Sequence, residues 1–97
     1  MLSQSTIKNQ IASHRSILTD KYHITSLFLF GSYARNEAHE NSDIDLLVDF
    51  SETPDLLSFI ETEEYLNSLF GKVVDLVPKR KLREELKQEV LQEAVRL

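Results

Sequence analysis

The chain reads Leu27-Phe28-Leu29-Phe30-Gly31-Ser32 and, after residues 33–41, Ser42-Asp43-Ile44-Asp45-Leu46-Leu47-Val48. The nearly continuous apolar run over residues 25–30 is typical of a strand covered on both faces, and it stops abruptly at Gly31-Ser32. Residues 43–50 predict a second strand whose two faces differ, because side chains alternate across a strand. One face carries Ile44, Leu46, Val48 and Phe50, and the other carries Asp43, Asp45, Leu47 and Asp49. A short helix beginning near Ser32 and a turn around Asn41 would connect the two strands.

Helical patterns lie on both sides of these strands. Residues 5–21 repeat apolar side chains at helical spacing, and His14 falls on the same stripe, which favours a histidine at the core edge over a ligand. Thr53-Pro54-Asp55 predicts a helix start with a capping threonine, and the helix that follows ends at Gly71. We expect a third strand over residues 72–77 and a last helix over residues 82–97.

The two later helices have predicted apolar faces. In the first of them the face consists of Leu56, Phe59, Ile60, Leu66 and Phe70. Glu63 also falls inside this face, and the sequence pattern does not explain why an acidic residue lies there. In the last helix the face consists of Leu82, Leu86, Val90, Ala94 and Leu97. Helices alternating with three strands predict an α/β (α+β) fold, a small mixed β-sheet with helices packed mainly on one face.

Length and composition are those of an ordinary globular domain. A chain of 97 residues accommodates one core, so we expect a single domain over residues 1–97. Eleven basic and sixteen acidic residues leave a net charge of −5, which argues against direct nucleic-acid binding. The absence of cysteine excludes disulfides and thiolate metal sites. No signal peptide or membrane span is evident, so we expect a cytoplasmic protein without membrane contact.

Gly31-Ser32 and the two aspartates of the second strand together indicate phosphate and metal chemistry. A glycine at a strand-to-helix junction lets a ligand approach the backbone, and a helix N-terminus offers N–H groups to an anion. Asp43 and Asp45 project from one face of a strand, and a cation such as Mg²⁺ relieves their mutual repulsion. Taken alone, Gly-Ser is also a common turn, and Asp-x-Asp is more often a solvated strand face.

Asp75 lies amid the apolar residues of the third predicted strand, Lys72-Val73-Val74-Asp75-Leu76-Val77. A lone buried carboxylate is costly, so this acid either faces water at a sheet edge or joins another group. If the third strand lies beside the second, Asp75 completes a cluster with Asp43 and Asp45.

In combination, three segments closely resemble the polymerase-β-type nucleotidyltransferase superfamily, and more narrowly its minimal nucleotidyltransferase (MNT) antitoxins. They are Gly31-Ser32-Tyr33-Ala34-Arg35, Asp43-Ile44-Asp45-Leu46-Leu47-Val48 and Gly71-Lys72-Val73-Val74-Asp75-Leu76-Val77. The resemblance implies a polymerase-β-like nucleotidyltransferase fold in which Gly31 and Ser32 hold a nucleoside triphosphate. It also implies that Asp43 and Asp45 ligate magnesium, with two ions expected. Asp75 would ligate the catalytic metal and help to deprotonate the attacking hydroxyl.

The same resemblance implies a function. MNT antitoxins transfer AMP from ATP to a tyrosine of a partner HEPN-domain toxin, and we expect this chain to dock its acceptor protein on an open site. Two alternatives stay open, namely a non-catalytic antitoxin that acts by binding, and a nucleotidyltransferase for a small molecule such as an aminoglycoside. The retained acids count against the first alternative, and the small size of the chain counts against the second.

Three further features are less specific. Arg35 either neutralises phosphate charge, which is the favoured interpretation, or pairs with Glu37 or Glu40. Asn36 stands where family members often carry glycine, and asparagine tolerates the left-handed conformation. A basic cluster is interpreted as a solvated face balanced by glutamates, with steering of ATP or an acidic partner as the alternative. It consists of Lys79, Arg80, Lys81, Arg83 and Lys87.

Overall fold

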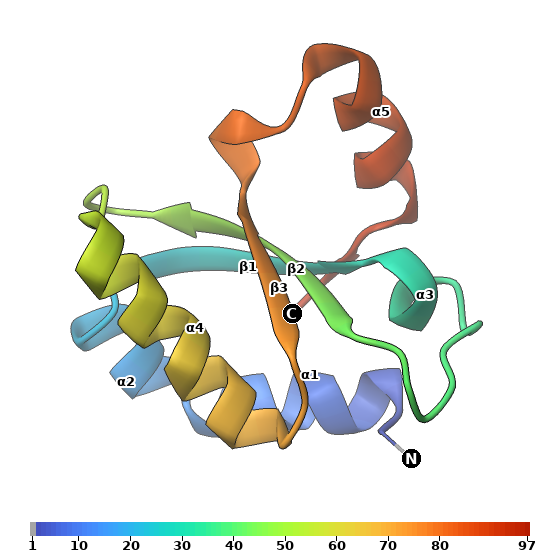
Figure 1. The fold of residues 1–97 in the computed structure, drawn as a ribbon, viewed down its shortest axis with the longest axis horizontal. Helices are drawn as coiled ribbons and strands as arrows, with labels where there is room; N and C mark the ends of the chain where they lie inside the picture. The colour runs from blue at the N-terminus through green and yellow to red at the C-terminus, as the bar shows by residue number, and fades with distance from the viewer. Residues whose placement is uncertain (1) are drawn as a thin grey trace.

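A computed structural model describes residues 2–97 of the chain and contains one mixed four-stranded sheet (Figure 1). Its strands are β1 (Ile24–Phe30), β2 (Ile44–Phe50), β3 (Val74–Pro78) and β4 (Val95–Arg96). The spatial order is β3-β2-β1-β4, in which β2 and β3 run parallel and the other two pairs run antiparallel. The predicted mixed sheet is therefore confirmed, with one strand more than the sequence indicated.

Helices lie on both sides of this sheet, and most of them lie on one side. They are α1 (Gln4–Ser13), α2 (Arg15–Asp20), α3 (Gly31–Ala34), α4 (Leu56–Phe70) and α5 (Glu84–Glu93), with a 3₁₀ turn η1 (Lys79–Lys81) before α5. Figure 1 shows α1, α2 and α4 together below the sheet and α5 above it. No helix within residues 2–97 combines the length and apolar composition needed to cross a membrane.

The hydrophobic core fills the space between the sheet and the lower helices. The predicted apolar face of β2 is buried at Ile44, Leu46 and Val48, and Leu47 on the opposite face is fully buried as well. Other core members include Ile7, Ile11, Leu18, Leu27, Leu29, Leu66 and Phe70. Burying each such side chain stabilises the fold by roughly 1.5–3 kcal/mol.

Helix α4 begins and ends near the predicted points, but its cap and its apolar face differ from the prediction. Asp55, not Thr53, is the N-cap, because its Oδ1 accepts a hydrogen bond from the Ser58 N–H at 2.8 Å. The helix ends at Gly71, whose φ of +64° is the left-handed conformation of a C-terminal stop. Leu56 and Ile60 were expected in the core, yet they are 76% and 40% exposed, since no element within residues 2–97 covers these two side chains.

The two terminal segments also differ from the prediction. The first helix breaks at His14, whose Nδ1 lies 2.8 Å from the Gln10 carbonyl oxygen and whose ring packs against Tyr65. The last helix ends at Glu93 and does not reach Leu97. The chain instead forms β4, which pairs with the otherwise unpaired edge of β1, and the Leu97 N–H donates to the Leu27 carbonyl at 3.0 Å. Pairing an open strand edge outweighs one further helical turn here.

The position of Glu63 is explained by the edge strand β3. Asn67 and Glu63 are one helical turn apart on α4, and both lie beside the outer edge of β3. The Val74 N–H donates to Asn67 Oδ1 at 2.7 Å. Burial and the neighbouring charge of Asp75 raise the Glu63 pKa, and the nearby Leu76 N–H partly lowers it. Glu63 therefore falls inside the apolar face because that part of α4 lies along the free edge of β3, where backbone N–H groups need partners.

Candidate active site

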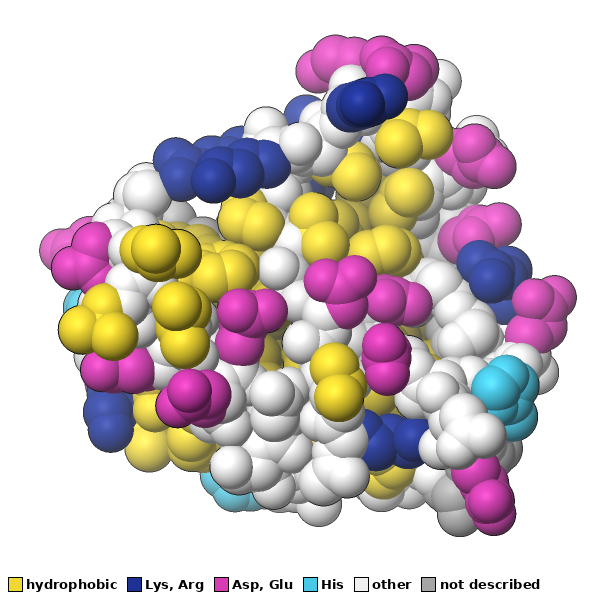
Figure 2. Space-filling model, viewed as in Figure 1, with side chains coloured by type: hydrophobic (Ala, Val, Ile, Leu, Met, Phe, Trp, Pro, Cys, Tyr) yellow, Lys and Arg dark blue, Asp and Glu magenta, His cyan; other side chains and the backbone are white. Residues whose placement is uncertain are grey.

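The sheet brings the predicted acids together. Asp45 on β2 lies directly opposite Asp75 on β3 in the parallel register, and neighbouring strands are about 4.8 Å apart. Asp43 precedes Asp45 by two residues and so lies on the same face of the strand. Asp45 is half-buried, whereas Asp43 and Asp75 are exposed. Figure 2 shows acidic side chains gathered over β3 at the centre of this face.

The electrostatics of the cluster favour a cation. Partial burial of Asp45 raises the pKa of its carboxyl, and the charges of Asp75 and Asp43 raise it further. Arg35 is near enough to lower that pKa, but it does not cancel the other effects. A positive ion beside the cluster would stabilise the ionised form of Asp45.

Gly31 touches this cluster directly. Its φ of +72° is a conformation that side chains rarely adopt, and a Cβ at this position would meet the Asp45 carboxylate, with Cγ only 3.0 Å away. Glycine is therefore required for space beside Asp45 as well as for the turn. The sequence predicted Gly31 as a place of close approach, but its contact with Asp45 becomes visible only in the fold.

Helix α3 follows Gly31 and carries the other predicted nucleotide-binding residues. Ser32 is half-buried in its first turn. Arg35 Nε donates to Glu37 Oε2 at 3.0 Å, and Arg35 Nη1 donates to Glu93 Oε2 at 3.4 Å. Of the two predicted partners of Arg35, Glu37 is therefore confirmed. The second carboxylate that Arg35 contacts is Glu93 of α5, not Glu40. Asn36 has a φ of +58°, which confirms the left-handed turn.

Lys72 belongs to this region, although sequence reasoning gave it no role. Its Nζ donates to the Glu40 carbonyl at 2.6 Å and to the Ser42 carbonyl at 3.1 Å. The side chain therefore ties the start of β3 to the backbone just before Asp43. A lysine that bonds main-chain carbonyls leaves no pattern in a sequence, so only the fold reveals it.

The donor set suits magnesium in an open site. Among residues 2–97, no three Asp, Glu or His side chains converge closely enough to hold an ion by themselves. Mg²⁺ prefers oxygen ligands and usually binds one or two carboxylates together with substrate phosphates. The paired Asp45 and Asp75, with Asp43 beside them, fit such a site, in which phosphate oxygens complete the ligand set.

The sequence of the chain is similar to known nucleotidyltransferases. Residues 11–97 match the protein family described as nucleotidyltransferase domain. The protein adenylyltransferase MntA of Thermococcus cleftensis is 45% identical over 95 residues, which cover 98% of this chain and 96% of that protein. All the predicted site residues lie within the matched range.

Solved structures share the same fold. One, described as a minimal nucleotidyltransferase, has a TM-score of 0.82 at 36% identity, covering 99% of this chain and 97% of its own. A chain of a toxin–antitoxin crystal structure with AMP-PNP has a TM-score of 0.73 at 31% identity, covering 92% and 70%. A chain from the complex of tri-AMPylated Shewanella oneidensis HEPN toxin with MNT antitoxin has a TM-score of 0.65 at 27% identity, covering 92% and 69%.

Proposed function

This chain belongs to the nucleotidyltransferase domain family, and from that membership we propose that it is a Mg²⁺-dependent protein adenylyltransferase. Its substrates are ATP and a tyrosine hydroxyl of a HEPN-domain toxin, so that it acts as the antitoxin of a cytoplasmic toxin–antitoxin pair. One observation carries the proposal, namely the pairing of Asp45 with Asp75 in register, with Gly31 packed against Asp45. Carboxylate oxygens and the strand-to-helix turn therefore lie at one point of the sheet.

In the proposed reaction, the tyrosine oxygen bonds to the α-phosphorus of ATP while the bond to pyrophosphate breaks. Asp75 accepts the hydroxyl proton, because it is exposed on the edge strand beside Asp45 and can be reached by a group from another molecule. Two bound Mg²⁺ ions would neutralise charge on the attacking, transferring and leaving oxygens. Asp43 and Asp45 would hold these ions together with Asp75.

Gly31, Ser32 and Arg35 are the proposed triphosphate-binding residues. Gly31 and Ser32 offer backbone N–H groups at the start of α3, and Ser32 adds a hydroxyl donor. Arg35 is exposed and contacts carboxylates at the surface, including Glu93 at 3.4 Å. A phosphate can replace Glu93 there, because a guanidinium binds either anion through the same donors.

The relatives support the choice of donor and acceptor. The Thermococcus cleftensis relative is named a protein adenylyltransferase. One structural neighbour pairs an MNT antitoxin with a tri-AMPylated HEPN toxin, and another contains AMP-PNP. These descriptions favour an adenine nucleotide as donor and a HEPN protein as acceptor for this chain.

The test is the intact mass of a HEPN-domain toxin after co-expression with this chain. We expect wild-type chain to add one or more adenylyl units to that protein. The double variant Asp43→Asn with Asp45→Asn should add none, because it removes two of the three clustered acids. Asp49→Asn is the matched control, since it changes an acid on the same strand and face, and it should retain transfer.

Each contrary result has a distinct meaning. If the double variant fully neutralises the toxin, and neither the wild-type chain nor the double variant increases the mass of the toxin, the chain acts by binding alone. A stable complex in which wild-type chain leaves the partner mass unchanged would also point to binding alone. Equal mass gain with wild type and the double variant would contradict the assignment of the acids.

A further inference from the structure

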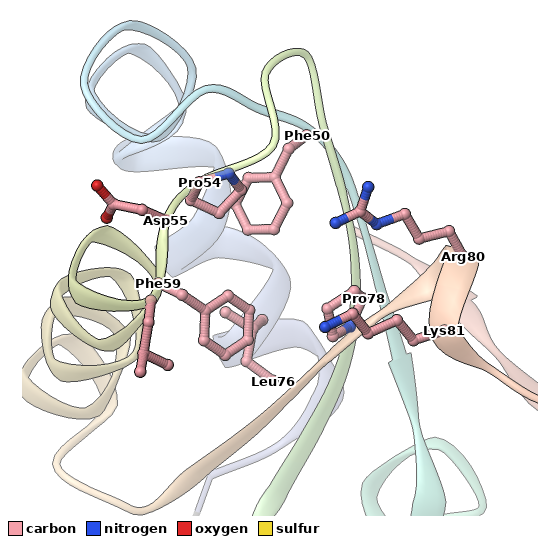
Figure 3. A pocket seen from close by; sticks show the side chains of 9 residues that line it. Phe50, Pro54, Asp55, Phe59, Leu76, Pro78, Arg80 and Lys81 are labelled. Carbon is pink, nitrogen blue, oxygen red and sulfur yellow. The ribbon is translucent and has the colours of Figure 1, made fainter.

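A groove of about 350 Å³ lies between the start of α4 and the junction of β3 with η1 (Figure 3). Its apolar wall includes Phe50 and Phe59, whose rings meet edge to face at 6.2 Å, together with Leu76 and Pro78. Figure 3 shows Arg80 and Lys81 extending toward these side chains from the η1 side, while the Asp55 carboxylate points away. We call this feature the α4–η1 groove.

The surface next to the groove is unusually apolar. Leu56, which lines the groove, is 76% exposed, and Leu57 beside it is 67% exposed. Ile60, one helical turn further along α4, is 40% exposed. Figure 2 shows apolar side chains over the N-terminal half of α4 and a basic cluster above them. A contiguous apolar area of this kind marks a binding surface more often than isolated exposed leucines do.

The charge at the groove is opposite to that of the whole chain. The chain carries a net charge of −5, yet the polar side chains reaching into the groove are cations. The ion pairs within residues 2–97 include neither Arg80 nor Lys81. Arg80 is held by a hydrogen bond from its Nη1 to Thr53 Oγ1 at 3.0 Å, which leaves its charge uncompensated. The groove therefore complements an apolar ligand that also carries a carboxylate.

The groove and the acids share one edge strand. Leu76 in the groove wall directly follows Asp75 on β3, and β3 is one of the two edge strands of the sheet. Consecutive residues of a strand are about 3.3 Å apart and point to opposite faces. A polypeptide lying over this edge can contact the groove while one of its side chains reaches the acids.

We infer that the α4–η1 groove docks the acceptor protein, through a segment of that protein that presents apolar side chains beside a carboxylate. This inference rests on the proposed function, because it takes a protein as the acceptor. The groove supplies affinity for the acceptor, whereas the acids supply the chemistry. Substitutions in the groove therefore weaken acceptor binding without changing nucleotide binding or the rate at saturating acceptor.

The test uses Leu56→Glu and Lys81→Glu, measured with the HEPN-domain toxin that serves as acceptor in the test of the proposed function. Both side chains are exposed, so neither change disturbs the core. Each should raise the Kd for that protein, and the KM for it as acceptor, by about tenfold or more, since each places a negative charge where a carboxylate docks. The affinity for AMP-PNP and kcat should stay within about twofold of wild type.

Matched controls come from α2, which lies outside the groove. Ile17 is 38% exposed and Arg15 is exposed, so Ile17→Glu and Arg15→Glu repeat the same chemical changes elsewhere. Both controls should leave the Kd for the HEPN protein unchanged. If the controls weaken binding as much as the groove variants do, the effect is one of net charge and the inference is overturned.

Other outcomes separate the inference from the proposed function. If the groove variants bind the acceptor as tightly as wild type and still transfer AMP, the docking inference is overturned, whereas the adenylyltransferase assignment is unaffected. If the groove variants bind the acceptor more weakly but even the wild-type chain transfers no AMP, the docking inference is supported and the adenylyltransferase assignment is contradicted. A wild-type dimer that becomes monomeric only in the groove variants, seen by sedimentation, would show that a second copy of this chain occupies the groove and would overturn the inference.

Discussion

At the scale of single residues, Gly31 and Asp45 form the tightest point of the site. The glycine has no side chain to collide with the carboxylate, and its positive φ turns the chain from β1 into α3. Sequence reasoning selected both residues as candidate site residues, because the motif spacing is specific. It did not predict their contact, since residues 14 positions apart meet only through the pairing of β1 with β2. Sequence reasoning gave no role to Lys72.

The raised pKa of Asp45 predicts that Asp45→Asn stabilises the metal-free protein. The ionised form is disfavoured in the fold by burial and by Asp75 and Asp43. The wild type therefore loses stability as pH rises from the ordinary carboxyl range through the raised pKa, and the variant lacks that loss. A change of 1 kcal/mol in the free energy of unfolding shifts the Tm of a domain this size by about 4–8 °C. Solvent screening weakens the electrostatic effect at Asp45, so the expected shift in Tm is smaller than this.

The measurement is thermal unfolding in EDTA at several pH values. The Tm of the variant should exceed that of wild type by a few degrees at neutral pH, and the gap should close toward acid pH. A variant that is less stable than wild type at neutral pH would contradict the electrostatic account of this cluster.

At the scale of elements, β3 shows how the sheet builds the site. Its inner edge pairs with β2 and aligns Asp75 with Asp45, while Asn67 of α4 accepts a hydrogen bond from its outer edge. The sequence predicted β1, β2, β3 and the ends of α4 well, because apolar runs and stop residues mark them. It did not predict β4, since a two-residue strand is stabilised only by the neighbour it joins. The exposed half of α4 was also assigned to the core, because periodicity identifies an apolar face but not what covers it.

Lys72 predicts a coupling between β3 and the loop that leads into β2. Its ammonium holds the Glu40 and Ser42 carbonyls, so Lys72→Met should free the backbone before Asp43. Hydrogen bonds to a charged donor contribute about 1.5–3 kcal/mol each, and partial exposure reduces this, so we expect a loss of about 1–2 kcal/mol in stability. Transfer activity should fall by about tenfold, because Asp43 is no longer held in position.

Hydrogen exchange and kinetics together check this prediction. Exchange of the amides of residues 40–44 should accelerate in Lys72→Met, and Lys72→Arg should restore part of the protection and of kcat. The matched control is Lys87→Met, which removes a half-buried lysine paired with Glu84 at 3.8 Å. Protected amides in Lys72→Met, or an equal loss of activity in the control, would show that Lys72 does not position Asp43.

At the scale of the whole molecule, the site lies where separate parts of the sheet meet. Asp45 comes from β2, Asp75 from β3, and Gly31 from the end of β1, so the acids approach one another only when the sheet has formed. An unfolded chain does not hold them together. A ligand that bridges them therefore binds the folded state alone and stabilises it by mass action.

Magnesium should accordingly raise the melting temperature of the wild-type chain when AMP-PNP is present to supply the phosphate oxygens that complete the ligand set. At a free ion concentration ten times the Kd, a ligand specific to the folded state adds about 1.4 kcal/mol, which corresponds to a rise of about 5–10 °C for a domain of this size. We expect the screening of surface charge to contribute little to this rise in Tm. Sodium chloride at matched ionic strength is the control for that contribution. Asp45→Asn should lose most of the rise, because it removes the central oxygen donor, whereas Asp49→Asn should keep it. If the chain and both variants, each with AMP-PNP, respond equally to magnesium and to sodium, the three acids do not hold the ion.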